Sequence, residues 1–165
     1  MVKAKTTKAI KKQTEQIKTG KPTYYYAVGR RKTAAARARL YILATETEVT
    51  LGDKKYTKGQ IIVNDKPIEN YFSGEVAKKA YIEPLRTTNN LNRFVITVRV
   101  EGGGLQGQLE AVIHAISRAL VKIDNEKYRP ILKKRKFLTR DPRAKQRRKA
   151  GFAGKARKRK QSPKR

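Results

Sequence analysis

The chain contains no cysteine and no tryptophan, and only 13 acidic residues accompany its 42 lysines and arginines. Without cysteine, disulfide bonds and thiolate zinc sites are excluded, and an intracellular, cytoplasmic location is expected. No apolar run approaches the roughly 20 residues that a membrane span needs. The sequence therefore predicts neither a membrane protein nor a disulfide-stapled secreted one.

Catalytic constellations are missing as well. His114 is the one histidine, and it falls beside an apolar stripe, where a packing role is favoured over a ligand role. One histidine without cysteine cannot form a zinc or redox pair, and the acidic residues are scattered. We therefore expect no enzymatic activity, no metal, no cofactor and no small-molecule substrate.

What the chain has instead is positive charge, with a formal net charge of +29. Residues 133–165 hold 17 lysines and arginines and one acid, Asp141. Such a polycation suits a nucleic acid or an anionic membrane surface. Membrane binding favours aromatic residues along one helical face, which this segment lacks, so nucleic acid is the preferred partner. A merely solvated tail and a DNA-compacting protein are the alternatives.

Charge and composition divide the chain into three parts. We expect a flexible, disordered basic arm at 1–22, a globular α+β domain at 23–132 and a basic, extended tail at 133–165. The tail has too few apolar residues to fold alone, so it should take its shape by lying along RNA. Asp141 and Pro142 resemble a helix start and Gly151 a stop, which predicts a short helix over about 142–150.

Hydrophobic periodicity predicts the elements of the middle part. Alternation indicates a strand at 36–42, with Arg37 and Arg39 on its outer face and a basic loop at 30–32 before it. A second strand is expected at 94–100 and a peripheral hairpin at 46–60. One helix is expected at about 74–81, ended by Pro84. A second helix follows the glycine-rich stretch and runs to Ile123. These elements favour a compact two-layer sandwich, with one sheet and two helices on one face.

The glycine-rich stretch Gly102–Gly107 matches a dinucleotide-binding pattern between a strand and a helix. The acidic residue of that pattern ends a second strand, and no residues remain for one before Asp124, so we reject a dinucleotide site. Two readings stay open. The glycines allow a close approach of an RNA phosphate to a helix N-terminus, or they form a tight turn.

Six stretches in this order then resemble one family, the ninth protein of the small ribosomal subunit, bacterial type. They are GRRKTAAARARL (29–40), IVNDKPIENYF (62–72), GGGLQGQ (102–108), HAISRAL (114–120), FLTRDPR (137–143) and the terminal KR. The resemblance covers residues 24–165. It differs at the C-terminal end, where the family has an aromatic residue and this chain has QSPKR, and at Gly154, an extra residue.

The resemblance implies a structural ribosomal protein whose partners are ribosomal RNA of the subunit head, neighbouring head proteins and P-site transfer RNA. The C-terminal tip would contact the anticodon stem-loop of the transfer RNA through Ser162, Pro163, Lys164 and Arg165. Ribosomal RNA contacts are expected at Arg30, Arg31, Lys32, Arg37, Arg39, Gly102, Gly103, Gly104, Gln106, Gly107, Arg118, Lys133, Lys134, Arg135, Arg140, Arg143, Arg147, Arg148, Lys149, Lys155 and Arg157.

Overall fold

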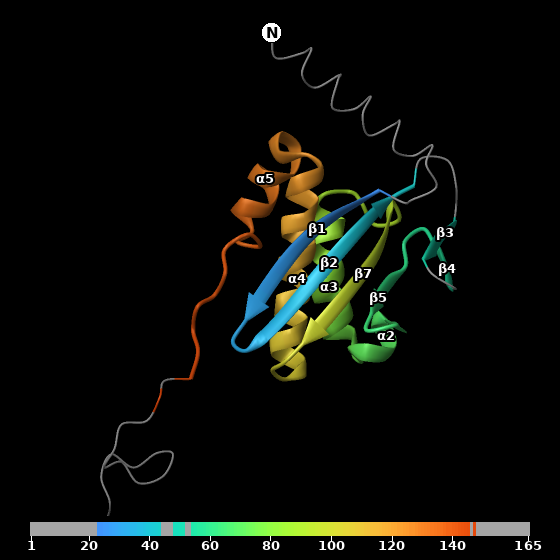
Figure 1. The fold of residues 1–165 in the computed structure, drawn as a ribbon. Helices are drawn as coiled ribbons and strands as arrows, with labels where there is room; N and C mark the ends of the chain where they lie inside the picture. The colour runs from blue at the N-terminus through green and yellow to red at the C-terminus, as the bar shows by residue number, and fades with distance from the viewer. Residues whose placement is uncertain (1–22, 44–47, 52–53, 146, 148–165) are drawn as a thin grey trace, which may run out of the picture.

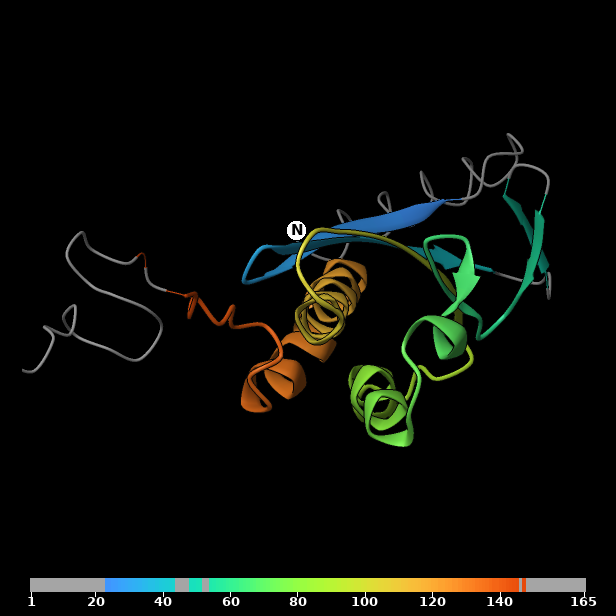
Figure 2. The same ribbon diagram turned by 90° about the horizontal axis from the view of Figure 1, so that it is seen from below.

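A five-stranded sheet lies at the centre of the fold, with its helices on one side (Figures 1 and 2). The structure is a computed structural model, which describes residues 23–43, 48–51, 54–145 and 147. The strand order is β1-β2-β7-β5-β6, with β5 parallel to β7 and the other neighbours antiparallel. These strands are β1 (Tyr24–Arg31), β2 (Ala34–Ile42), β5 (Ile61–Val63), β6 (Lys66–Pro67) and β7 (Phe94–Glu101).

Within the described residues, the remaining elements are a hairpin and four helices. The hairpin pairs β3 with β4 as a separate antiparallel sheet, in agreement with the hairpin predicted over 46–60. The bounds are β3 (Glu48–Leu51), β4 (Lys54–Thr57), α2 (Ile68–Tyr71), α3 (Glu75–Thr87), α4 (Leu105–Ile123) and α5 (Asn125–Lys134). The α+β class and the helix-covered sheet are therefore confirmed. The ten-residue helix α5 is a third helix beside the two that the sequence predicts.

The strands β2 and β7 have the alternation that the sequence predicts. Ala36, Ala38 and Leu40 are fully buried, whereas Arg37 and Arg39 are exposed. In β7 the residues Phe94, Ile96, Val98 and Val100 face the same core. The two neighbouring strands therefore present an apolar side to the helices and a largely polar side away from them.

The helix α4 packs across β1 and β2, and its predicted apolar stripe is buried. Small residues allow this close packing, because Ala36 and Ala38 on β2 face Ala111 and Ala115 on α4 within one core. Gly29 of β1 is the tightest point, since a methyl group there would overlap the α4 backbone. The absence of a side chain at Gly29 thus sets how closely the helix approaches the sheet.

The strand β1 corrects one prediction. Arg30 and Arg31, expected in a loop, are the last two residues of β1, and the turn consists of Lys32 and Thr33. The whole of β1 pairs with β2, from Tyr24 opposite Tyr41 to Arg31 opposite Ala34. Backbone pairing, which the charged sequence does not reveal, extends the strand to Arg31.

The helix predicted over about 74–81 is longer than expected, because α3 continues through Pro84 to Thr87. Proline removes one backbone hydrogen bond from a helix interior, but Pro84 is buried and Tyr81 and Leu85 beside it are each 2% exposed. The hydroxyl groups of Thr87 and Thr88 donate to carbonyl oxygens of the last turn, at 2.8 Å from Glu83 and 2.9 Å from Pro84. Packing and these side-chain bonds hold the helix together beyond the proline.

Gly29→Ala tests the contact between α4 and β1. The new Cβ would lie 2.5 Å from the Ala115 nitrogen and closer still to the Ala111 oxygen, and neither backbone atom can move aside alone. We expect the free energy of unfolding to fall by about 3 kcal/mol or more, measured by chemical denaturation followed by circular dichroism.

Gly104→Ala is the matched control, because Gly104 has an ordinary φ of −109° and no atom within 4 Å of the added Cβ. The control should unfold at nearly the wild-type denaturant concentration. Equal stabilities of the two variants would contradict the close approach at Gly29.

Candidate nucleic-acid interface

The first residues of the tail are packed against the folded domain. Lys133 and Lys134 belong to α5, and a turn follows in which the Phe137 nitrogen donates to the Leu132 oxygen at 3.1 Å. Phe137 and Leu138 are partly buried against the main core. The folded domain therefore extends past the boundary that charge alone predicts at residue 133.

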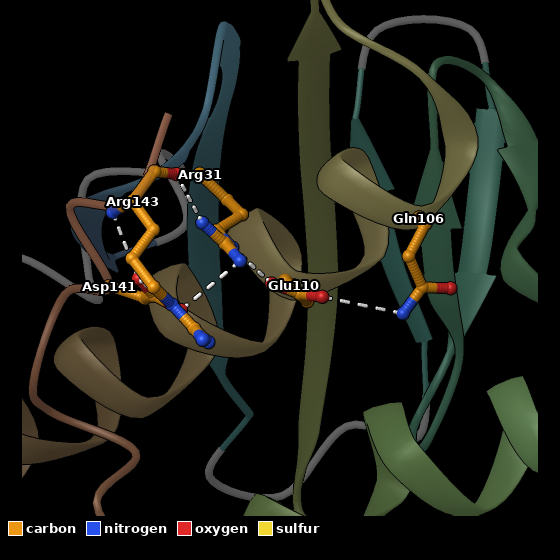
Figure 3. A network of polar contacts seen from close by, with 5 residues as sticks. All are labelled: Arg31, Gln106, Glu110, Asp141 and Arg143. Atoms are coloured by element: carbon orange, nitrogen blue, oxygen red, sulfur yellow. Dashed lines mark hydrogen bonds and ion pairs between the residues drawn. The ribbon is translucent and has the colours of Figure 1, made fainter. Parts of the chain in front are cut away.

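A network around Arg31 fixes the next residues (Figure 3). The Arg31 side chain pairs with Glu110 of α4 and, at 3.1 Å, with the Asp141 carboxylate, and it donates to the Arg143 carbonyl oxygen at 2.7 Å. Gln106 donates to the other oxygen of Glu110 at 3.4 Å. One guanidinium group thus joins β1, α4 and the start of the tail.

Asp141 is held by both of its arginine partners. Arg143 donates to it from the backbone nitrogen at 2.9 Å and from the guanidinium at 2.7 Å. These bonds, foremost the side-chain bond from Arg143, hold the pKa of Asp141 well below its ordinary value, and the charge of Arg31 lowers the pKa further. The carboxylate stays ionised at physiological pH and keeps the network intact.

This network changes two predictions about the tail. Residues up to Arg143 contact the folded domain through this network and through Phe137 and Leu138, so part of the predicted tail has partners within the protein. The bond from the Arg143 nitrogen to Asp141 has the spacing of a helix N-cap, yet residues 142–145 form no helix. Residue 147 is not helical either, and residues 146 and 148–150 of the predicted helix lie outside the described residues.

Arg31 itself has a different place from the one predicted. It was grouped with Arg30 and Lys32 as a contact for ribosomal RNA, but it is 9% exposed and its guanidinium is bound inside the protein. The register explains the difference, because Arg31 lies opposite Ala34 on the helix-covered side of β1, whereas Arg30 lies opposite Ala35. Reading period two from Tyr24 onward would have found it.

The glycine-rich turn is explained by its geometry. Gly102 and Gly103 have φ angles of 72° and 66°, which glycine adopts most readily. A Cβ at Gly103 would lie 3.0 Å from that of Ala34, the first residue of β2. Gly107 is buried close to the Arg31 backbone, while Gly104 and Gln106 are exposed. Turn formation accounts for most of the glycines, and phosphate binding there stays a prediction.

The other predicted RNA contacts among the described residues are exposed. Some also have partners in the protein: Arg118 donates to the Val28 oxygen at 2.6 Å, and Arg135 pairs with Glu83 at 2.7 Å. The exposed set comprises Arg30, Lys32, Arg37, Arg39, Arg118, Lys133, Lys134, Arg135, Arg140, Arg143 and Arg147. Arg148, Lys149, Lys155, Arg157, Ser162, Pro163, Lys164 and Arg165 lie outside the described residues, as does the arm at 1–22.

Arg99, Tyr24 and Tyr26 are further exposed side chains near these arginines that are not among the predicted contacts. Arg99 is the exposed residue opposite Arg37 on β7, and Tyr26 lies opposite Arg39 on β1. Their signal was the alternation of β7, whose outer residues were passed over, and the run of three tyrosines at 24–26. Together with Arg37 and Arg39 they line one groove on the sheet face away from the helices.

His114 lies next to the tail, on α4. Its Nδ1 atom is buried and has no hydrogen-bond partner among the described residues. Burial lowers the pKa of His114, and the nearby charges of Arg118 and Arg140 lower it further, while the Leu138 backbone opposes the shift. The histidine is therefore neutral at pH 7 and packs beside the tail, which fits the packing role that the sequence favoured.

The described part of the chain offers neither a metal-binding group nor a membrane-spanning helix. No three or more His, Asp and Glu side chains there come together as a metal-binding group. None of the helices in that part is long and apolar enough to cross a membrane.

Comparison with known proteins gives one consistent result. The sequence model of a family described as "Ribosomal protein S9/S16" matches residues 29–165. A protein of Maridesulfovibrio salexigens named small ribosomal subunit protein uS9 is 46% identical over 131 residues, which cover 79% of this chain and 89% of that protein. A protein of the same name from Thermotoga petrophila is 45% identical over 128 residues, covering 78% and 87%.

Arg31→Leu should release the start of the tail. The substitution leaves two carboxylates without their shared cation, and bonds to charged groups contribute about 1.5–3 kcal/mol each. We expect the free energy of unfolding to fall by about 2 kcal/mol and trypsin to cleave faster after Lys136 and Arg140, as followed by mass spectrometry.

Arg30→Leu provides the control, because it removes the same charge from the adjacent, exposed position. It should leave both the unfolding curve and the cleavage rate near wild type. If Arg30→Leu and Arg31→Leu behave alike, the network does not hold the tail.

Proposed function

The chain belongs to the ribosomal protein S9/S16 family and is a structural component of the small ribosomal subunit, in which we propose that it binds ribosomal RNA of the head. The observation that carries this proposal is the family match, which runs from the strand β1 to the last residue. Both relatives carry the name of a small-subunit protein, and neither is named as an enzyme. Neighbouring head proteins would complete its surroundings.

The charge of the chain supports RNA as the partner. Its net charge of +29 needs many counter-charges, and a phosphate backbone supplies them at close spacing. Contacts of lysine and arginine with phosphates position a protein on RNA without reading its sequence. The domain would contribute Arg30, Lys32, Arg37, Arg39, Arg118 and the exposed cations from Lys133 to Arg147, and the rest of the tail Arg148, Lys149, Lys155 and Arg157.

The C-terminal tip would contact P-site transfer RNA. Support comes from the family resemblance of the tail and from its direction, since the described segment that follows α5 leads away from the sheet (Figure 1). Beyond Arg147 a fully extended chain reaches at most about 60 Å, at roughly 3.3 Å per residue. Ser162, Pro163, Lys164 and Arg165 could thus act far from the domain, with Arg165 suited to phosphate or stacked bases.

Neutralising the exposed cations of the domain tests the ribosomal RNA contact. Arg30, Arg37 and Arg39 are replaced by Gln, and Arg31 is kept because it holds the fold. We expect the variant to enter small subunits several-fold less well in competition with the wild type, because each lost phosphate contact weakens binding. Quantitative mass spectrometry of subunits separated on sucrose gradients measures this.

A triple variant of Lys66, Lys79 and Arg86 to Gln removes the same charge from exposed positions elsewhere. It should enter subunits at the wild-type level. Equal incorporation of both triple variants would show that net charge alone, and not this part of the domain, governs binding.

Deleting residues 162–165 tests the transfer RNA contact. The shortened protein should enter small subunits normally, because the domain and most of the tail remain. Dissociation of P-site transfer RNA from these subunits should become several-fold faster, since each lost cation removes attraction to the phosphates. Filter binding over time measures the dissociation rate.

The double variant Lys164→Gln/Arg165→Gln keeps the length of the chain and removes only charge. It therefore separates the effect of the lost charge from that of the shortened tail. An intermediate effect is expected from it. Unchanged dissociation with both variants would remove the tip from the account of transfer RNA binding.

A further inference from the structure

The sheet face opposite the helices is open on one half. Figure 2 shows the helices gathered on the other side, and the hairpin β3–β4 stands beside this face. The half near the hairpin is apolar and closed, because Tyr41, Ile62 and Val95 are buried there against Leu51 and Tyr56. The other half, over β1, β2 and β7, borders a groove of about 570 Å³, which is also lined by Tyr56 and Ile62 of the apolar half and by Asn64 and Asp65 after β5. We call this half the open face.

Two exposed tyrosines and three arginines line the open face. Tyr24 is 47% exposed and Tyr26 39% exposed, and both lie on the edge strand β1. The Tyr24 ring is braced by Tyr41, whose centroid is 5.5 Å away, and by the Arg39 guanidinium at 5.3 Å. Aromatic rings held in place and left uncovered are suited to stacking.

Two arginines of the open face, Arg37 and Arg99, are placed so that their charges destabilise the sheet. Arg37 and Arg99 lie directly opposite each other on β2 and β7, a placement in which like charges repel. Glu101 is 4.0 Å from Arg37 but is 60% exposed, and Arg99 has no ion pair with any described residue. An external anion at this place would relieve the repulsion.

Exposed rings beside arginines that are weakly paired (Arg37) or have no ion pair among the described residues (Arg99) together point to unpaired nucleotides. In an RNA duplex the bases are stacked on one another and their faces are not available, whereas single-stranded loops offer both base faces and phosphates. Stacking on aromatic rings and phosphate contacts with arginine are the two interactions by which proteins hold single strands. The strands β1 and β7 lie about 10 Å apart, so two or three nucleotides could cross the face.

We propose that the open face binds unpaired nucleotides of RNA, with bases stacked on Tyr24 and Tyr26 and phosphates at the arginines. This inference rests on the proposed binding of ribosomal RNA and adds to it which form of RNA is bound and where. Of the residues that line the groove, the exposed or outward-facing ones on β1, β2 and β7 are Tyr24, Tyr26, Arg37, Arg39, Thr97 and Arg99, and one carboxylate, that of Asp65, lies at its border.

The test compares two probes on the full chain, an unstructured single-stranded RNA and a hairpin duplex with the same number of phosphates. Binding of each is measured over a range of salt concentrations, because phosphate contacts weaken with salt and stacking does not. The Tyr24→Leu/Tyr26→Leu variant should bind the single strand about tenfold less tightly for each ring removed. That loss should be the same at every salt concentration, with duplex binding unchanged.

Two matched variants complete the test. Tyr24→Phe/Tyr26→Phe keeps both rings and should bind the single strand as the wild type does. Arg99→Gln should reduce the salt dependence of single-strand binding by about one unit of slope. Unfolding curves of all variants show whether the fold is retained, and the Phe variant still tests stacking if the Leu variant unfolds.

The outcomes separate this inference from the proposed function. If the wild type binds neither RNA, the proposed ribosomal RNA binding fails. If it binds both and the Leu variant loses nothing, RNA binding stands and the open face is not its single-strand surface. An equal or larger loss on the duplex would assign the face to paired RNA and overturn the inference, as would loss of binding in the Phe variant.

Discussion

The buried charge of Arg31 is the constraint on which the architecture depends. A guanidinium group with 9% exposure must be neutralised inside the protein. Its two carboxylates come from distant parts of the chain, Glu110 from α4 and Asp141 from the tail. Because both are needed, the direction in which the tail leaves the domain is built into the fold. The proposed contact of the tail with a remote RNA would then start from a fixed point on the domain.

Arginine side chains have opposite effects on stability on the two sides of the sheet. On the helix-covered side, Arg31 is paired and stabilises the fold. On the other side, Arg37 and Arg99 lie opposite each other without full compensation, which costs stability in the free protein. This difference separates the cations that hold the structure from those offered to a polyanion, and a count of lysines and arginines does not reveal it.

Much of the fold could be predicted from the sequence, because α4, β2 and β7 bury one side with a regular period. The prediction that Pro84 ends the helix α3 was wrong, because the buried packing of Tyr81 and Leu85 outweighs the lost hydrogen bond. The role of Arg31 was hidden because its partners lie 79 and 110 positions away, and only the register of β1 turns it toward α4. Charge alone also does not reveal that Phe137 and Leu138, beyond residue 133, pack on the domain.

An electron cryo-microscopy structure of the small subunit containing this chain is the most direct measurement. The account predicts that Arg31 still contacts Glu110 and Asp141, that Arg37 and Arg99 face RNA, and that the chain beyond Arg143 runs along RNA. An Arg31 side chain turned outward to a phosphate, with the first tail residues detached from α4, would contradict it.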